Sequence, residues 1–206
     1  IPREYEGYSV TEILSGAFDG YTGITSITIP ESVTMVYGDA FKGCTGIKEI
    51  NVPADASYVD KELFEDTAFY KDDSNWENNV LYICGILVEA KENIAGTCVI
   101  KNGTERIAAS AFADCTGITS VTMPGSVTDI SENAFAGCTG LTSVTIPDGV
   151  TYIGYEAFKD CTGLTSVTMP GSVAVISDSA FVGCTGLTSV TIPDGVTYIG
   201  YEAFKD

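Results

Sequence analysis

The sequence predicts a solenoid, in which one short structural unit per repeat stacks on its neighbours in place of a single globular core. The dipeptide Ala-Phe recurs every 23 residues through most of the chain, for example at Ala134-Phe135 and again at Ala157-Phe158. The block Leu141–Asp160 is repeated without a single change at Leu187–Asp206. A fixed period of this length is typical of stacked coils, and it indicates the architecture more strongly than the function.

Seven Ala-Phe dipeptides and one Leu-Phe dipeptide mark eight repeat positions along the chain of 206 residues. They are Ala17-Phe18, Ala40-Phe41, Ala111-Phe112, Ala134-Phe135, Ala157-Phe158, Ala180-Phe181 and Ala203-Phe204, with Leu63-Phe64 in the equivalent place. Ala111 follows Leu63 by 48 residues, which is two periods plus two. We therefore expect one array over residues 1–206, with regular repeats at about 1–66 and 95–206 and a divergent insert at about 67–94.

Each unit is predicted to begin with a short strand. Leu141, Val144 and Ile146 form the pattern L-x-x-L-x-L, which is the strand signature of a leucine-rich repeat. Because Val144 and Ile146 lie two residues apart, both face the interior, and the residues between them face outward. Pro147 has no amide hydrogen to donate to a ladder, so it ends the strand.

The second half of each unit is predicted to return to the start of the next strand. Asp148-Gly149 supplies a turn after the strand. Val150 and Ile153 are three residues apart and Ala157 follows four later, a spacing that fits a tight, partly helical return with an inward face. The small Ala157 lets the return approach the strands, and Phe158 fills the space between the two sides.

The insert departs from this pattern. Val80–Ile83 and Ile86–Val88 flank Cys84-Gly85 and predict a hairpin. The only tryptophan, Trp76, is interpreted as a packing anchor. The regular stack is predicted to resume at Ala95, Cys98 and Ile100, which align with Leu141, Val144 and Ile146.

The unit L-x-x-V-x-I-P-x-x-V-x-x-I-x-x-x-A-F-x-x-C resembles the BspA-like class of leucine-rich repeats over nearly the whole chain. The resemblance implies a leucine-rich-repeat solenoid, a right-handed β/α superhelix with parallel strands on the concave face and short helical or irregular returns on the convex face. Proteins of that class are mostly bacterial surface or secreted proteins, many of them implicated in adhesion to host matrix or to other cells. The resemblance therefore implies an extracellular or cell-surface location.

The composition argues against several classes of function. Twenty-eight acidic residues against 10 basic ones give a net charge of -18, which repels nucleic acids and anionic membranes. This charge serves solubility alone or favours basic patches on a partner. No apolar run is long enough to cross a bilayer, and no signal segment opens the chain. The chain stops at Asp206, just before the next expected Cys, which indicates a piece of a longer array.

The inventory of reactive residues also argues against an enzyme and against a cofactor. The chain has no histidine, and no pairing of a nucleophile with a base is visible. Asp148, Glu156 and Asp160 recur with the repeat and are interpreted as a solvated face. Asp72-Asp73 is the densest acidic pair in the insert, but it lacks the oxygen-rich spacing of a calcium loop.

The cysteines are predicted to be structural. Cys44, Cys115, Cys138, Cys161 and Cys184 share one repeat position. Equivalent side chains point the same way, so we expect a buried ladder of reduced thiols that behave as small apolar groups. A ladder does not converge on one point, so no metal site is expected. Cys98 takes an inward strand position, and a Cys84–Cys98 disulfide in a secreted insert stays open as an alternative.

The outward strand positions are the candidate binding face. They are all small hydroxyl residues: Ser120, Thr122, Ser143, Thr145, Ser166, Thr168, Ser189 and Thr191. Cross-strand pairs of this kind also stabilise a sheet, so a purely structural role explains them as well. A second candidate set, repeating with a period of 46, comprises Tyr152, Tyr155, Tyr198 and Tyr201, which are either contact residues or packing between coils.

The leading hypothesis is a cell-surface or secreted recognition protein that binds a host or cell-surface protein or glycan through an extended solenoid face. The alternative is a structural spacer that projects a functional domain, because near-identical repeats offer little variety for a specific site. A more distant hypothesis is ice binding by the regular Ser-x-Thr rows.

Overall fold

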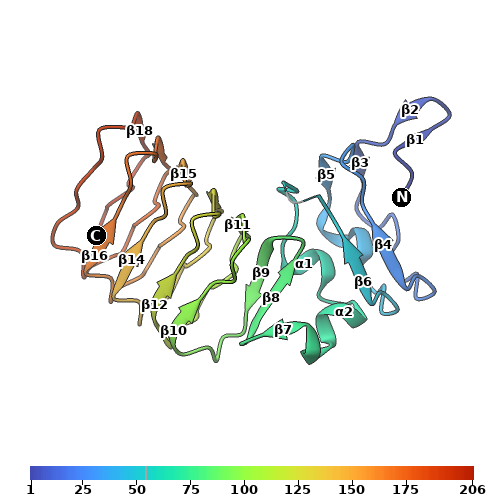
Figure 1. Cartoon of the computed structure of the whole chain (residues 1–206), viewed down its shortest axis with the longest axis horizontal. Helices are drawn as coiled ribbons and strands as arrows, with labels where there is room; N and C mark the ends of the chain where they lie inside the picture. The colour runs from blue at the N-terminus through green and yellow to red at the C-terminus, as the bar shows by residue number, and fades with distance from the viewer. Residues whose placement is uncertain (54) are drawn as a thin grey trace. The chain divides into compact units, whose positions relative to one another are not determined.

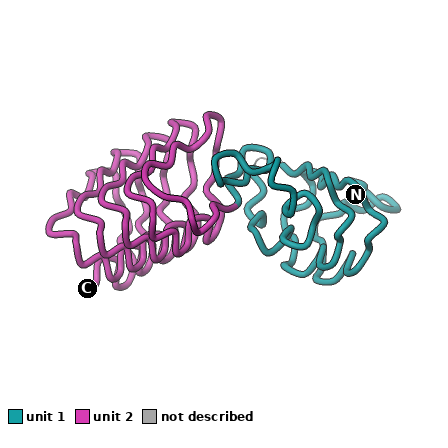
Figure 2. Tube along the Cα trace, turned by 90° about the horizontal axis from the view of Figure 1, so that it is seen from below, with its two compact units in different colours: residues 1–88 teal, residues 89–206 magenta. Residues whose placement is uncertain are grey.

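A computed structural model describes residues 1–53 and 55–206, and these form two compact units, residues 1–88 and 89–206 (Figure 2). In both units successive turns of the chain are joined by short parallel strands (Figure 1). The predicted parallel-strand solenoid is therefore confirmed. The boundary between the units falls within strand β9 (Ile86–Ala90), near the end of the predicted insert.

Unit 1 combines two parallel strand pairs with short helices. Strand β3 pairs with β5 and strand β4 with β6, whereas β1 and β2 form an antiparallel pair at the N-terminus. The strands are β1 (Glu4–Tyr5), β2 (Tyr8–Ser9), β3 (Glu12–Ile13), β4 (Ser26–Thr28), β5 (Met35–Val36) and β6 (Glu49–Asn51). The helices are η1 (Gly38–Phe41), α1 (Lys61–Phe64), α2 (Ala68–Lys71) and η2 (Asp73–Asn75).

The insert folds as a capped helical segment followed by short strands. Strand β7 (Trp76–Glu77) pairs antiparallel with β8 (Val80–Ile83). Cys84 and Gly85 have φ angles of 47° and 84°, the left-handed conformation that a two-residue hairpin turn requires. The predicted hairpin between β8 and β9 is confirmed. The indole NH of Trp76 donates to the carbonyl of Tyr70 at 2.9 Å, which supports its interpretation as a packing anchor.

Unit 2 contains two parallel ladders, one on each side of the coil (Figure 1). The first ladder comprises β10 (Gly96–Val99), β12 (Ile118–Thr122), β14 (Ser143–Thr145) and β16 (Ser166–Thr168). The second ladder includes β11 (Arg106–Ile107), β13 (Asp129–Ile130), β15 (Tyr152–Ile153), β17 (Val175–Ile176) and β18 (Tyr198–Ile199). Val144 lies opposite Val167, so equivalent residues of successive repeats meet in register.

The second ladder was not predicted from the sequence. Among the described residues of unit 2, no return contains a helix, whereas η1 and α1 lie on the returns of unit 1. In unit 2 the amides of the return bond to the next coil, as when Phe158 donates to the carbonyl of Ala180 at 2.8 Å. Other amides bond within the return, as when Lys159 donates to the carbonyl of Glu156 at 3.0 Å, so the return is a series of turns stacked on the next coil and not a helix.

The core of unit 2 follows the predicted inward positions. The side chains of one coil that are 0–2% exposed are Leu141, Val144, Ile146, Val150, Ile153, Ala157, Phe158 and Cys161. The phenylalanine rings form a continuous stack, with centroids 4.9–5.2 Å apart from Phe112 through Phe204. The stack resumes after the insert as predicted, because Cys98 lies opposite Val121, and Val121 lies opposite Val144.

Two kinds of coil alternate in unit 2, and packing gives the reason. A Cβ added to Gly154 would lie 2.6 Å from the carbonyl carbon of Ser131 in the preceding coil, so this position has no room for a side chain. The equivalent position in both adjacent coils is a serine, Ser131 or Ser177. Another column alternates in the same way, because Gly183 packs against the carboxylate of Asp160. The stacking unit is therefore a pair of coils, which accounts for the 46-residue period.

Candidate functional site

The predicted outward residues of the first ladder lie side by side on one face of unit 2. We call this the hydroxyl face; its residues are Ser120, Thr122, Ser143, Thr145, Ser166 and Thr168. Ser143 pairs with Ser166 and Thr145 with Thr168 across adjacent strands. All six side chains are exposed except Ser120, which is half-buried and bonds to Thr97 at 2.9 Å between hydroxyl oxygens.

The hydroxyl face is uncharged, because all of its side chains are serine or threonine. Within the described part of the chain, the hydroxyl groups of Ser143, Thr145 and Thr168 have no hydrogen-bond partner. The flanking Thr142 and Thr165 differ, because their hydroxyls donate to carbonyls of the preceding coil at 3.1 and 3.0 Å. The face therefore offers hydroxyl groups to a partner, but it contains no group that would discriminate between partners by charge.

The last two predicted members of this face are placed differently. Ser189 and Thr191 are exposed, but residues 187–193 lie outside the described strands. Val190 is only half-buried and Ile192 is 37% exposed, whereas the equivalent Val144 and Ile146 are 2% exposed. Residues 187–206 form the last coil that the structure describes, and their inward side chains are covered by the preceding coil alone. The ladder accordingly ends at β16.

The strands of the second ladder and the turns that follow them contain the four predicted tyrosines, together with carboxylates that were not predicted as site residues. We call this the tyrosine–carboxylate face; its residues are Asp129, Glu132, Tyr152, Tyr155, Asp178, Tyr198 and Tyr201. Tyr152 lies opposite Asp129 on one side and Val175 on the other. The four tyrosine residues are exposed to different extents: 40% at Tyr152, 44% at Tyr155, 52% at Tyr198 and 73% at Tyr201.

Tyrosine and carboxylate groups contact one another across the coils of this face. The carboxylate of Asp178 accepts a hydrogen bond from the Tyr198 hydroxyl at 3.2 Å and another from the Tyr201 amide at 2.8 Å. The bond to Asp178 raises the pKa of Tyr198 above its ordinary value. The pKa of Tyr155 is likewise raised, in the first place by its hydrogen bond to Glu156. These tyrosines therefore stay neutral at physiological pH.

The cations near this face are already engaged within the chain. Between residues 120 and 206 the sequence has nine acidic residues and two lysines. Lys159 bonds to Glu156 and Lys205 bonds to Glu202, each at 2.8 Å. On β11 the Arg106 side chain is 12% exposed and lies 3.4 Å from Asp129. The face consequently has a surplus of negative charge beside exposed aromatic rings.

The cysteine ladder is buried and reduced, as predicted. All seven cysteines are free, and only Cys84 is exposed, so neither Cys84 nor Cys98 is in a disulfide. The thiols also have a role that sequence reasoning missed. Cys138, Cys161 and Cys184 each donate to a phenylalanine carbonyl 26 residues earlier, at 3.0–3.1 Å. Burial raises the pKa of Cys98 to about 11 and is the main reason that the pKa of Cys115 rises to about 12.

No part of the described chain gathers three or more His, Cys, Asp or Glu side chains in a position to hold a metal ion. Asp72, from the acidic pair considered for calcium, instead caps η2 by accepting a bond from the Ser74 amide at 2.9 Å. This bond lowers the pKa of Asp72 below its usual range. Within residues 1–53 and 55–206, no helix combines the length and hydropathy that crossing a bilayer requires.

Comparison with known families agrees with this architecture. The model of the BspA type leucine rich repeat region matches residues 6–83 and 91–206, in six copies. The chain belongs to the BspA-type leucine-rich repeat family. No match is found among curated proteins.

Solved structures of other leucine-rich repeat proteins resemble this BspA-type chain. A leucine-rich repeat protein from Bacteroides ovatus is 25% identical with a TM-score of 0.50, and the match covers 97% of this chain and 52% of that one. A leucine-rich repeat protein of T. pallidum is 25% identical over 97% of this chain and 71% of that one, with a TM-score of 0.43. A leucine-rich cell surface protein from Faecalibacterium prausnitzii is 26% identical over 95% and 65%, with a TM-score of 0.42. This chain thus spans about half the length of the Bacteroides protein.

The carboxylates of the tyrosine–carboxylate face were missed although the sequence carries a signal for them. Positions 129, 152, 175 and 198 form one column of the BspA-type repeat, and positions 132, 155, 178 and 201 form another. In the second column Glu132 and Asp178 alternate with Tyr155 and Tyr201. An alignment of the repeats with periods of both 23 and 46 residues therefore predicts that these side chains are neighbours.

Proposed function

We propose that this chain is a recognition module, extracellular or at a cell surface, that binds a protein or glycan partner through an exposed ladder of unit 2. One observation carries the proposal: outward side chains of unit 2 repeat in register and are exposed on both ladders. Regular rows of solvent-exposed side chains suit an extended contact surface better than a cleft. Membership of the BspA-type leucine-rich repeat family supports the same proposal.

The available chemistry supports binding rather than catalysis. The chain has no histidine, and the buried thiols have pKa values above the ordinary range, so they are poor nucleophiles at neutral pH. The pKa of Glu156 is lowered by its hydrogen-bonded ion pair with Lys159, and that of Asp72 by the Ser74 amide, so both carboxylates are held in structural contacts. We therefore propose that the chain acts without a catalytic centre.

The test is a binding screen of the 206-residue chain against extracellular matrix proteins and a glycan array. Each hit is measured again with two variants, Thr145→Ala/Thr168→Ala on the hydroxyl face and Tyr152→Ala/Tyr155→Ala on the second ladder. We expect at least one specific partner, with binding weakened tenfold or more by one variant and little by the other. Circular dichroism establishes that both variants fold. Binding that neither variant changes would contradict recognition through a ladder of unit 2.

The second candidate is a spacer, and one observation favours it. Residues 141–160 and 187–206 are identical, so these two coils present the same side chains and add length without adding variety. Deleting residues 138–183 removes one two-coil unit and leaves the alternation of coils intact. Affinity for a partner of the full-length protein that survives this deletion would favour the spacer. Loss of that affinity would favour recognition by unit 2.

A further inference from the structure

We infer that the tyrosine–carboxylate face binds an arginine-rich segment of a partner protein. The inference rests on the proposed recognition function and assigns it a face and a partner chemistry. It begins with Tyr152 and Tyr155, which belong to a coil that has neighbours on both sides. These two residues are 40% and 44% exposed, although the coil around them is packed.

Carboxylates flank these two tyrosines on adjacent coils. Glu132 precedes Tyr155 by one repeat and Asp178 follows it by one, and backbone bonds join the three coils at this level. The amide of Asn133 donates to the carbonyl of Tyr155 at 2.9 Å, and that of Glu156 donates to the carbonyl of Asp178 at 3.2 Å. Parallel strands lie about 4.8 Å apart, so a cation placed on the Tyr155 ring has a carboxylate within reach on either side.

The chain does not neutralise this face by itself. Both lysines between residues 120 and 206 pair with a glutamate three residues away, and Arg106 is largely buried against Asp129. Glu132 is exposed, and within the described residues it has no ion pair. Exposed aromatic rings beside unneutralised carboxylates complement a cation that can both stack and bond.

These features favour arginine over other cationic groups. A guanidinium is planar, stacks on a tyrosine ring and donates to two acceptors at once, whereas a lysine ammonium acts as a hydrated point charge. Anionic partners such as nucleic acids are repelled by the same carboxylates. The face repeats at Tyr198 and Tyr201, two coils from the first pair, which is a separation of about 10 Å. A segment with several arginines can therefore engage both pairs.

The experiment uses the 206-residue chain and three labelled peptides of equal length. One peptide alternates arginine with serine, one alternates lysine with serine, and one alternates glycine with serine. Affinities are measured by fluorescence anisotropy at 50 and 150 mM salt. We expect the arginine peptide to bind about five- to twenty-fold more tightly than the lysine peptide, because each stacking contact contributes a factor of a few. The neutral peptide should not bind.

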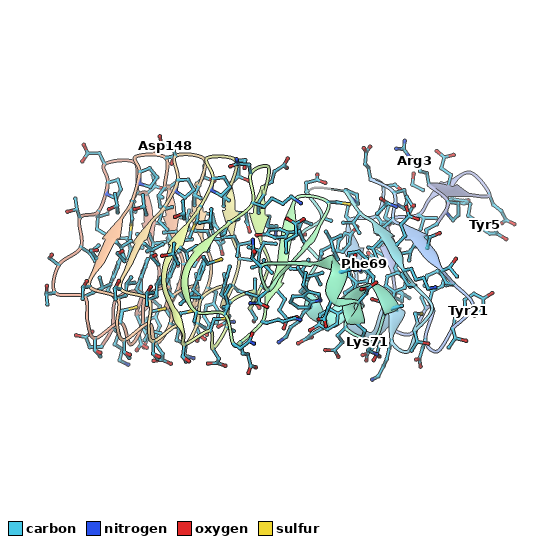
Figure 3. The ribbon with its side chains drawn as sticks, turned by 60° about the horizontal axis from the view of Figure 1, so that its bottom comes forward. Arg3, Tyr5, Tyr21, Phe69, Lys71 and Asp148 are labelled. Carbon is cyan, nitrogen blue, oxygen red and sulfur yellow. The ribbon has the colours of Figure 1, made fainter. Side chains whose placement is uncertain are left out.

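Two variants separate aromatic from electrostatic contributions. Tyr152→Ala/Tyr155→Ala keeps the charge of the chain and should abolish the preference for arginine over lysine. Glu132→Gln/Asp178→Asn should weaken both basic peptides about tenfold, and it serves as the second test if the tyrosine variant fails to fold. The matched control is Asp148→Asn/Asp194→Asn, which removes two charges elsewhere; Figure 3 shows Asp148 pointing away from the coil at the turn between the ladders. This control should change binding less than twofold.

Several outcomes would overturn the inference. Equal binding of the arginine and lysine peptides, unchanged by the tyrosine variant, would indicate attraction by net charge alone. An equal loss of affinity in the Asp148→Asn/Asp194→Asn control would indicate the same. If the screen instead yields a neutral glycan, or a partner lost with Thr145→Ala/Thr168→Ala, the recognition function stands and this assignment fails. If neither peptides nor screened molecules bind, both proposals fail.

Discussion

In unit 2 the ring of Phe158 lies 5.1 Å from the rings of both Phe135 and Phe181, and the ring planes differ by 2–3°. In unit 1 the rings of Phe41 and Phe64 are 5.8 Å apart and inclined by 15°. The same repeat position is filled in both units, so the difference comes from the rest of the coil. Coils of similar sequence stack with nearly uniform geometry, and coils that diverge do not.

The divergent coils at the end of unit 1 add local bonds from their own side chains. The side chain of Asp60 caps α1 by accepting from the Leu63 amide at 3.2 Å, and Thr67 caps α2 by accepting from the Tyr70 amide at 3.1 Å. Regular returns bond to the next coil in both units: Phe18 donates to the carbonyl of Ala40 at 2.9 Å, and Phe135 donates to that of Ala157 at 2.8 Å. The sequence of a BspA-type coil can therefore vary where its own side chains satisfy the backbone amides. It must keep the repeat pattern where the neighbouring coil satisfies them.

Phe158→Ala should produce the largest loss of stability. The side chain is fully buried between two rings, and removing such a group costs about 3–5 kcal/mol through lost burial and the cavity left behind. Phe18→Ala is the matched change in unit 1, where the ring is half-buried and stacks only on Phe41. Urea unfolding should show the Phe18 variant losing clearly less. Equal losses would contradict the view that regular stacking carries the stability of unit 2.

Gly154→Ala should be the next most disruptive change. The added methyl would meet the backbone of Ser131 and Glu132 at 2.6–2.8 Å, and a clash with backbone forces the coils apart at a cost of about 1–3 kcal/mol. Gly171→Ala is the control, because nothing lies within 4 Å of its added methyl and its φ is not positive. The control should be neutral or stabilise by a few tenths of a kcal/mol. Thermal unfolding followed by circular dichroism compares the two; a neutral Gly154→Ala would refute the two-coil packing rule.

Much of this fold could be predicted because its determinants are local to one repeat. Val144, Ile153 and Phe158 were assigned to the interior from spacing alone, and each is buried. The hairpin turn at Cys84-Gly85 followed from two short apolar runs. In these cases one repeat, or one short segment, contains the whole pattern.

The remaining features depend on contacts between coils, which a single repeat does not encode. The strand at Tyr152–Ile153 is too short to show an alternating pattern, so the spacing of Val150 and Ile153 fitted a helical return equally well. The bond from the Cys161 thiol to the Phe135 carbonyl depends on the offset between adjacent coils. The tyrosine–carboxylate face required knowing which columns become neighbours across the second ladder.

Thr67→Ala tests the local bonds that distinguish unit 1. The Thr67 side chain is fully buried; its hydroxyl donates to the Phe64 carbonyl at 2.7 Å and also caps α2. Loss of this cap should cost about 1–2 kcal/mol. Trp76 is the only tryptophan and lies in unit 1, so its fluorescence reports the loss there. Thr145→Ala on the hydroxyl face is the control and should cost less than about 0.5 kcal/mol. A cost as small for Thr67 would mean that α2 does not depend on its cap.

The buried thiols of unit 2 should make the free energy of unfolding depend on pH in the alkaline range. Near neutral pH the thiols stay protonated, so this dependence is absent there. The pKa of Cys98 is raised by burial from 9.0 to about 11, so the folded chain holds this proton more tightly than the unfolded chain. The thiol therefore contributes its full stabilisation below pH 9 and loses it as the pH rises from about 9 through 11. Urea unfolding at pH 8 and pH 10.5 should show a smaller loss for Cys98→Val than for the unaltered chain. Because tyrosines titrate equally in both proteins, an identical loss in the two would show that the thiol is not the group responsible.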